Sequence, residues 1–419
     1  MRGWELWTRL GSPRYVAAPM VDQSELPFRL LARTLGTDLA YTPMMHARLM
    51  AECDAYRASV FDPHPDDRPL IGQLAGHDPA VLIEAARHVQ GPVDAVDLNF
   101  GCPQGIARRG RYGAFLLEEP DLAVKLVGSL ADALDVPVTA KVRLLPSLSE
   151  SVALCRRLVD AGASVLCVHG RTRLQNKQTA GSADWGGIRT IVEAIGADVP
   201  VIANGGIGDA IDVKACLAAT GAAAVMSSEA LLENPALFCA NRHPVTGDYL
   251  DQRTMARMYL DMCERYGVAS HGHVRGHLFK MCHGSLRVHP RARDALCASY
   301  KLEDYANVLT LIDELGWAEP NFHSERVERS ASWYWRHRPM EHGASDEGSE
   351  KVGDSGVEEQ PTREKVAEAA LLRRSRKQQL RRQRRAVRNA AKKATTAQRA
   401  ATAAPRVSAS SMLAAQVQL

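Results

Sequence analysis

The chain has 419 residues, of which 46% are hydrophobic and 24% are charged. That is enough apolar material for one large domain, or for two to three ordinary ones with a substantial core. No apolar run approaches the ~20 residues that cross a bilayer, and the first residues resemble neither a signal nor a transit peptide, so we expect a soluble protein of the cytoplasm or nucleus. The nine cysteines are odd in number and form no CxxC pair, which argues against a disulfide framework and a zinc ribbon.

The net charge of +4 is unevenly distributed along the chain. Residues 373–399 contain many Lys and Arg residues and no Asp or Glu, so the rest of the chain is net acidic. This basic segment favours a polyanionic partner, nucleic acid before membrane, because it has few large apolar residues. A solvated tail or a nuclear-import signal explains it equally well.

Eight short runs rich in Val, Ile, Ala and Leu follow one another, and most of the intervals between them have helical periodicity. The runs are 15–20, 38–43, 69–74, 93–100, 136–143, 163–170, 199–206 and 222–228. Buried strands that alternate with amphipathic helices predict a parallel sheet. Eight such units match the ~250 residues of a TIM (β/α)8 barrel. An open, doubly wound α/β sheet is the alternative, but no GxGxxG follows the first strand.

The pattern changes after the predicted barrel. We expect a lead-in over residues 1–11, the barrel over 12–245 and a smaller all-helical domain over 246–335, where only helical periodicity is found. Residues 336–365 are an acidic Gly/Ser linker without periodicity, and residues 366–419 are a basic tail. We expect the tail to be disordered or partly helical.

The barrel prediction locates the candidate site, because TIM-barrel enzymes carry their active sites at the carboxyl ends of the strands. The residues at these ends are mostly polar and of complementary types. They are Pro19, Met20, Gln73, Asn99, Cys102, Lys141, Arg143, His169, Arg171, Asn204, Gly205, Gly206, Ser227 and Ser228. Each is weak evidence alone, since a strand-end histidine is more often structural and a lone lysine is usually solvated. Their convergence on one rim favours a catalytic site.

Several motifs in this order and spacing resemble those of the tRNA-dihydrouridine synthase family. They are APMVDQSELPFR, GQLAG, DLNFGCPQ, YGAFLL, TAKVR, VHGRT, IANGGI and ENPALF. The resemblance covers about residues 12–330, and the variants FGCPQ, YGAFL and SSEALLENPALF are similar to the eukaryotic type that acts at tRNA positions 16 and 17. It implies FMN at the rim, NADPH as electron donor, tRNA as the partner and reduction of the 5,6 double bond of uridine. We expect a monomer that binds no membrane.

The resemblance also implies a role for each rim residue. Cys102 would be the general acid that gives a proton to C5 of uracil when hydride from the reduced flavin reaches C6. A thiol has an unperturbed pKa of about 8.5 and burial raises it, so a thiol in this position would stay protonated at neutral pH. Asn99, Arg143 and Arg171 would bind the substrate.

The remaining rim residues would bind the cofactor, with Lys141 stabilising the negative charge of the reduced flavin. These residues are Pro19, Met20, Gln73, Lys141, His169, Asn204, Gly205, Gly206, Ser227 and Ser228. Backbone N–H groups of residues 204–207 and 227–230 are expected to hold the FMN phosphate. The chain departs here from the commonest family pattern, which has NGD after the seventh strand and a Gly-Arg pair after the eighth.

Two other functions stay open. A flavin TIM-barrel oxidoreductase that acts on a free pyrimidine would use a similar Asn and Cys, but it would need neither a basic helical domain nor a basic tail. A non-catalytic tRNA-binding factor would not need Cys102, Lys141 or His169. Basic residues in 108–111 and 280–293 favour an RNA substrate. The histidines between 271 and 289 fit no common zinc spacing, so we expect no metal.

Overall fold

The computed structural model describes residues 2–176, 181–318 and 332–335. Within these ranges, parallel strands form one sheet in the order β2-β1-β9-β8-β7-β6-β5-β4-β3, and a further pairing of β2 with β4 closes it into an eight-stranded barrel. The strands are β1 Tyr15–Ala17, β2 Leu39–Tyr41, β3 Met45–His46, β4 Leu70–Ala75, β5 Ala95–Phe100, β6 Val138–Arg143, β7 Ala163–His169, β8 Val201–Asn204 and β9 Ala224–Ser227. The predicted TIM barrel is confirmed, and the two-residue β3 is added beside β4. The expected linker and basic tail lie outside the described residues.

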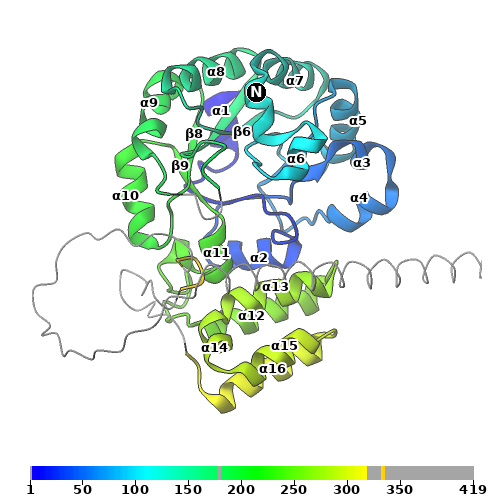
Figure 1. Ribbon diagram of the computed structural model, residues 1–419, viewed down its shortest axis with the longest axis vertical. Helices are drawn as coiled ribbons and strands as arrows, with labels where there is room; N and C mark the ends of the chain where they lie inside the picture. Colours follow the sequence, from blue (N-terminus) through cyan, green and yellow to red (C-terminus); the bar gives the residue numbers. More distant parts are fainter. Residues whose placement is uncertain (1, 177–180, 319–331, 336–419) are drawn as a thin grey trace, which may run out of the picture. The chain divides into compact units, whose positions relative to one another are not determined.

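Helices surround the barrel on its outer side (Figure 1). They are α2 Leu26–Thr34, α3 Ala47–Glu52, α4 Asp54–Val60, α5 Pro79–Val89, α6 Gly105–Gly110, α7 Pro120–Ala133, α8 Leu148–Asp160, α9 Trp185–Ile195, α10 Ala210–Thr220 and α11 Glu229–Glu233, with 3₁₀ turns at η1 Gly113–Glu118 and η3 Leu237–Cys239. The side chains of Asp78, Ser147, Asp184 and Asp209 accept backbone hydrogen bonds at the starts of α5, α8, α9 and α10. Each cap satisfies an N–H group that the helix itself leaves unpaired.

The amino end of the barrel is closed by a helix, α1 (Gly3–Arg9), in the stretch that was expected only as a lead-in. Its residues Leu6 and Trp7 are buried among inward-facing strand residues such as Val165 and Ile202, whereas Trp4 is exposed. The short amphipathic pattern of this helix is therefore explained by an apolar plug. Side chains alternate along each strand, so each strand has inward positions at both ends of the barrel. The apolar side chains of α1 pack at the amino end, and the inward positions at the carboxyl end carry polar residues.

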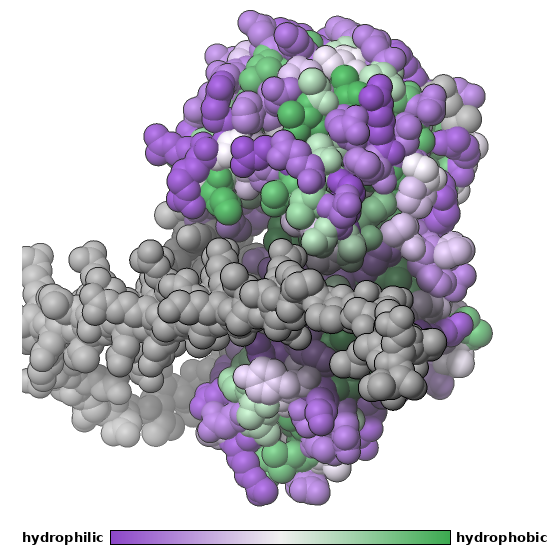
Figure 2. Space-filling view, turned by 90° about the vertical axis from the view of Figure 1, so that its right-hand side faces the viewer, coloured by the Kyte–Doolittle hydropathy of each residue, from purple (hydrophilic) through white to green (hydrophobic). Residues whose placement is uncertain are grey.

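A helical region follows the barrel and belongs to the same compact unit. It consists of α12 Gln252–Tyr266, α13 His271–Met281, α14 His283–Val288, α15 Pro290–Ala298 and α16 Leu302–Leu315. Hydrophilic side chains dominate the face of the molecule in Figure 2. Among the described residues, no helix has the length and apolar character needed to span a bilayer.

The helical region is attached to the barrel through the buried carboxylate of Glu25, just before α2. Glu25 accepts a hydrogen bond of 2.8 Å from the hydroxyl of Tyr259 and lies 3.0 Å from Nε2 of His277. The imidazole of His277 stacks on the ring of Phe28, with centroids 4.5 Å apart. Burial raises the pKa of Glu25, but the charge and hydrogen bond of His277, with other hydrogen bonds, outweigh burial and bring it to about 2. The carboxylate is thus held in its ionised form.

We expect Glu25→Gln to lower the free energy of unfolding by about 3 kcal/mol at pH 7, because a depressed carboxyl pKa stabilises the fold at every pH above its unfolded value. This contribution is fully present above the unfolded pKa of 4.5 and is lost as the pH falls towards 2. Urea unfolding at pH 7 and at pH 3 measures it, with Glu84→Gln on the exposed face of α5 as the control. A Glu25→Gln protein as stable as the control at pH 7 would show that the pair does not hold the helical region.

Candidate active site

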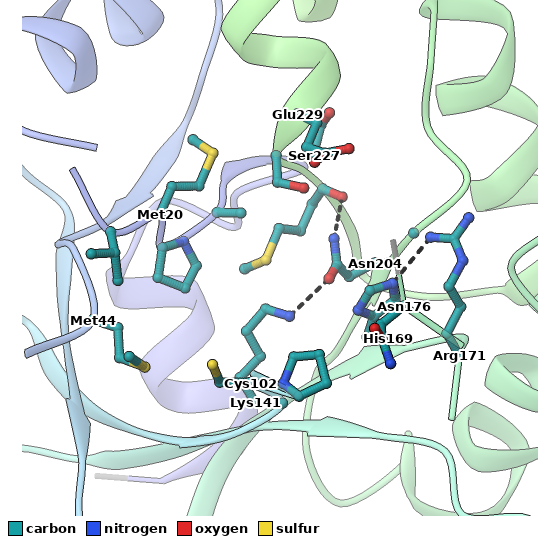
Figure 3. A pocket seen from close by; sticks show the side chains of 18 of the residues that line it. Met20, Met44, Cys102, Lys141, His169, Arg171, Asn176, Asn204, Ser227 and Glu229 are labelled. Atoms are coloured by element: carbon teal, nitrogen blue, oxygen red, sulfur yellow. Dashed lines mark hydrogen bonds between the residues drawn. The ribbon is translucent and has the colours of Figure 1, made fainter. Parts of the chain in front are cut away.

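A cavity of about 1170 Å³ opens at the carboxyl ends of the strands, and side chains from several strands point into it (Figure 3). All the residues predicted for the site line it. They are Pro19, Met20, Gln73, Asn99, Cys102, Lys141, Arg143, His169, Arg171, Asn204, Gly205, Gly206, Ser227 and Ser228. Closure of the parallel sheet brings them together, because every strand ends at the same rim. Their individual roles stay predictions.

Cys102 lies in the turn after β5, half-buried and at the edge of the cavity. The side-chain oxygen of Asn99 accepts hydrogen bonds from the N–H groups of Gly101 at 3.1 Å and Cys102 at 2.9 Å. On its other side, the cysteine packs against a small apolar cluster that includes Tyr112 and Phe115. The turn is therefore held by the amide of Asn99 and by packing against this apolar cluster.

Gly113 holds the main chain of the same turn. Its φ of +71° is in the left-handed region, and a Cβ there would lie 2.6 Å from the carbonyl oxygen of Cys102. The next residue, Ala114, donates its N–H to that oxygen at 3.0 Å. Only glycine allows this close approach without moving the backbone of Cys102. This explains physically the glycine of the YGAFLL motif.

A chain of hydrogen bonds runs from the barrel interior to the cysteine turn. Asp97 is fully buried and accepts hydrogen bonds from Nε2 of Gln73 at 2.8 Å and from the hydroxyl of Thr139 at 2.7 Å. The other end of the Gln73 amide accepts a hydrogen bond of 2.8 Å from Nδ2 of Asn99. Gln73 and Thr139 are the direct neighbours of Asp97 on β4 and β6. The Asn99 amide, expected to bind substrate, thus has both polar atoms engaged within the protein and positions the turn of Cys102.

The negative charge of Asp97 is unfavourably buried at neutral pH. Burial raises its pKa to about 6, although the hydrogen bonds from Thr139 and Gln73 and the charge of Lys141 all act to lower it. The carboxyl is therefore mostly ionised at pH 7, at a cost in stability. Asp97 was not among the residues predicted for the site, because an inward position in mid-strand is typical of the core.

Lys141 projects from β6 towards the middle of the rim, beside Cys102 in Figure 3. Its ammonium group donates a hydrogen bond of 2.8 Å to Oδ1 of Asn204, whose Nδ2 donates to the carbonyl oxygen of Met226 at 2.9 Å. The backbone of β9 thus sets the orientation of the Asn204 amide, and the amide sets the position of the ammonium group. Burial lowers the pKa of Lys141, and the charge of Arg143 lowers it further.

His169 and Arg171 form a second polar pair at the end of β7. Arg171 Nη1 lies 3.2 Å from Nε2 of His169, and other donors of the same guanidinium reach the carbonyl oxygen of Gly181. An arginine only donates, so Nε2 accepts and the imidazole proton sits on Nδ1. Burial, followed by the charges of Lys141 and Arg143, lowers the pKa of His169 well below its usual value, which keeps the ring neutral.

Arg143 ties two loops together at the edge of the cavity. Its Nε donates to the carbonyl oxygen of Gly101 at 2.7 Å, and its Nη1 donates to the carbonyl oxygens of Thr172 and Gln175. Burial and then the charge of Arg171 lower its pKa to about 10. The guanidinium stays protonated at neutral pH. Together with Lys141 and Arg171, it makes this side of the cavity positive.

The loops after β8 and β9 have features that suit an anionic group. The hydroxyl of Ser227 is buried and has no hydrogen-bond partner among the described residues. Gly205 and Gly206 have φ values of +103° and +78°, and a Cβ on Gly205 would lie 2.7 Å from the ring of His169. Free hydroxyl and closely packed glycine backbone are what a phosphate requires. The serine hydroxyl and the glycine backbone fit the phosphate of the expected flavin nucleotide.

The cavity is also lined by residues that were not predicted for the site. Lys280 comes from α13, and Trp333 and Tyr334 come from the short described stretch 332–335. Lys280 lies in a segment expected to be a basic face of the helical region, but only the tertiary structure shows that it reaches the barrel rim. Among the described residues, no group of three or more His, Cys, Asp or Glu side chains is arranged to hold a metal ion.

Comparison with known proteins agrees with the geometry of the site. The family model described as dihydrouridine synthase matches residues 16–310, which contain every residue predicted for the site. The chain belongs to the dihydrouridine synthase family.

Curated members of the dihydrouridine synthase family include relatives of two named types. A rat protein named tRNA-dihydrouridine(16/17) synthase [NAD(P)(+)]-like is 44% identical over 311 residues, covering 74% of this chain and 69% of its own. A Saccharomyces cerevisiae tRNA-dihydrouridine(16/17) synthase is 45% identical over 241 residues, or 57% of each chain. The 20a/20b synthase of the same yeast is 36% identical over 231 residues, covering 54% of this chain and 62% of its own.

We expect Gly113→Ala to lower the free energy of unfolding by about 1–3 kcal/mol, because the new methyl group meets backbone and the left-handed φ is strained for alanine. Displacement of Cys102 should also speed its alkylation by iodoacetamide, which peptide mass spectrometry follows at that residue. Gly91→Ala is the matched control, since a Cβ there meets nothing within 4 Å. Identical stability and alkylation in the two variants would show that Gly113 does not hold the turn.

We expect Asp97→Asn to make the protein less sensitive to high pH. An acid with a raised native pKa destabilises the fold as the pH rises from its unfolded pKa of 3.8 through its folded value of about 6. Between pH 5 and 8 the wild type should therefore lose roughly 1–2 kcal/mol that the variant keeps. An asparagine can still accept from Gln73, and Thr139 can then accept from its amide. Urea unfolding at both pH values measures the difference, and parallel pH dependences would refute the assignment.

Proposed function

We propose that this protein is a tRNA-dihydrouridine synthase that reduces the 5,6 double bond of uridines 16 and 17 in the D-loop of tRNA. The observation that carries the proposal is the Cys102 thiol and the Lys141–Asn204 pair in one cavity (Figure 3). Reduction of a conjugated double bond needs a hydride source on one face of the ring and a proton donor for the carbon that becomes negative. Cys102 supplies the proton donor, and the positive cavity would hold the flavin that supplies the hydride.

FMN is the cofactor that we propose for this cavity, with NADPH as its reductant. The relatives' printed names specify NAD(P)(+), which supports a nicotinamide donor. Lys141, His169 and Asn204 would hold the flavin ring, and Ser227, Ser228 and the glycine backbone after β8 would hold its phosphate. FMN, when reduced, supplies the hydride for C6 of uracil.

The protein's own residues provide the proton and hold the group that donates it. The S–H bond of Cys102 breaks as its proton passes to C5, and the thiolate then regains a proton from water, so the pyrimidine gains one hydride and one proton. Asn99 and Gly113 fix the backbone of the turn that carries the sulfur, through the N–H group and the carbonyl oxygen of Cys102. Neutral His169 and cationic Lys141 would stabilise negative charge that develops near the rim during the reaction.

A tRNA substrate is supported over a free pyrimidine by the extent of the cavity. Its lining reaches beyond the barrel rim to Lys280 of the helical region and to Trp333. A free base beside the proposed FMN would not need the part of the lining formed by Lys280 and Trp333, whereas an extruded nucleotide brings its ribose, phosphates and neighbours with it. Positions 16 and 17 are supported by the two yeast relatives, because the 16/17 enzyme is 45% identical and the 20a/20b enzyme is 36% identical over similar lengths.

The test is nucleoside mass spectrometry of unmodified tRNA after incubation with the purified protein, FMN and NADPH. We expect a mass gain of two hydrogens in uridine, mapped to positions 16 and 17, and a rate at least about 100-fold lower for Cys102→Ala, because a positioned general acid contributes roughly that much. Cys297→Ala is the matched control, since this cysteine is exposed on α15.

The outcomes separate the candidate functions. Equal rates for Cys102→Ala and wild type would keep the synthase activity and remove Cys102 from its role. Reduction of free uridine or uracil, with no reaction on tRNA, would replace the proposal by a free-pyrimidine reductase. Binding of tRNA by a protein that takes up no FMN would indicate a non-catalytic factor.

A further inference from the structure

A short stretch beyond the family match forms part of the cavity wall. Residues 332–335 lie outside the matched range of 16–310, and they are held by the buried carboxylate of Glu233 at the end of α11. Glu233 accepts hydrogen bonds from the hydroxyl of Ser332 at 2.6 Å and from the N–H groups of Trp333 at 2.7 Å and Tyr334 at 3.0 Å. A carboxylate that accepts three hydrogen bonds away from water is a strong anchor. The wall is therefore fixed through its backbone.

The three aromatic residues of this stretch have different surroundings. A Cβ added to Gly208 would lie 2.8 Å from the Trp335 ring and 2.9 Å from the Tyr334 ring, so these two rings pack on the loop after β8. They also contact each other edge to face, with centroids 5.0 Å apart. Trp333 is half-buried and lines the cavity. Two rings thus fix the stretch, and the third faces the space in which the substrate would lie.

Lys280 adds a positive charge beside the indole of Trp333. Its Nζ lies 5.4 Å from the centre of the ring, within the ~6 Å range of a cation–π interaction. The same ammonium group donates a hydrogen bond of 2.8 Å to the carbonyl oxygen of Gly276 and another to the side chain of Gln23. Gln23 also lines the cavity. The indole of Trp333 and the ammonium group of Lys280 thus lie together where α13, Gln23 and the stretch 332–335 meet.

The strand order places this pair across the cavity from Cys102. In the closed barrel, β9 is separated from β5 by three strands in either direction, so the two lie on opposite sides of the ring. Trp333 is anchored through α11, which directly follows β9, and Cys102 directly follows β5. A strand that crosses the cavity with one base at Cys102 would bring a neighbouring nucleotide to the side of Trp333. Bases stack on aromatic rings, and phosphates pair with ammonium groups.

We propose that Trp333 and Lys280 form a second nucleotide subsite, in which the indole stacks on a base that neighbours the target uridine and the ammonium group binds its phosphate. The proposal rests on the proposed tRNA substrate. It assigns to a stretch outside the family match the task of orienting the substrate strand. Removal of the indole leaves the Glu233 anchor intact, because Trp333 contributes its backbone N–H to that anchor.

Steady-state kinetics on unmodified tRNA with the full-length, FMN-loaded protein test the subsite. Stacking of a base on an aromatic side chain is worth enough that Trp333→Ala should raise the KM for tRNA roughly 5- to 100-fold, with kcat nearly unchanged. Trp333→Phe should recover most of the loss, because phenylalanine also stacks. Lys280→Ala should weaken tRNA binding and reduce its salt dependence by about one phosphate contact. Trp4→Ala, which removes an exposed indole from α1, is the matched control.

The result separates this proposal from the one on which it rests. Inactive wild-type protein would refute the synthase activity itself. Active wild type with an unchanged KM in Trp333→Ala would refute the subsite alone. A fall in kcat at constant KM, equal in the Ala and Phe variants, would also overturn it by showing that Trp333 only supports the wall. FMN content and thermal unfolding of each variant verify that the cavity is intact.

Discussion

The position of the turn that carries Cys102 depends on one buried carboxylate that accepts hydrogen bonds. Because Asp97 accepts, Gln73 must present its NH₂ group to it and its carbonyl oxygen to Asn99. Asn99 then has its own carbonyl oxygen left for the N–H groups of Gly101 and Cys102. This acceptor thus sets the direction of the hydrogen bonds that run through Gln73 and Asn99 to the cysteine turn. The unfavourable burial of its charge is the cost of that order.

Buried carboxylates also join the helical region and the stretch 332–335 to the barrel. Glu25 accepts from Tyr259 and pairs with His277 of the helical region, and Glu233 accepts from the stretch 332–334. In each case a buried carboxylate near a rim strand collects donors from a segment distant in sequence. Such contacts are specific, because a carboxylate without its partners would remain buried and unpaired. They attach the helical region and the stretch 332–335 to the barrel.

The barrel and the rim residues were predictable because they follow from short-range patterns. Continuous apolar runs, helical intervals and the rule that strands end at one rim predict from the sequence that Cys102, Lys141 and Asn204 lie together. Asp97 lies within a predicted strand, but its importance comes from its register with Gln73 and Thr139, which a single sequence does not specify. The helix α1 was missed because its pattern is only two turns long. Trp333 was missed because its place depends on a hydrogen bond to a residue 100 positions away.

The attachments made by Glu25 and Glu233 lie on the same side of the barrel, and this has a consequence for selectivity. Glu25 precedes α2, which follows β1, and Glu233 ends α11, which follows β9; β1 and β9 are neighbours in the sheet. The helical region and the stretch 332–335 are therefore joined to one sector of the rim, and Cys102 lies in the opposite sector. The groups proposed to react and the groups proposed to select the strand are then carried by different elements. With this arrangement, a change in the attached wall would alter substrate preference while the proposed reacting groups keep the geometry that the strand register imposes.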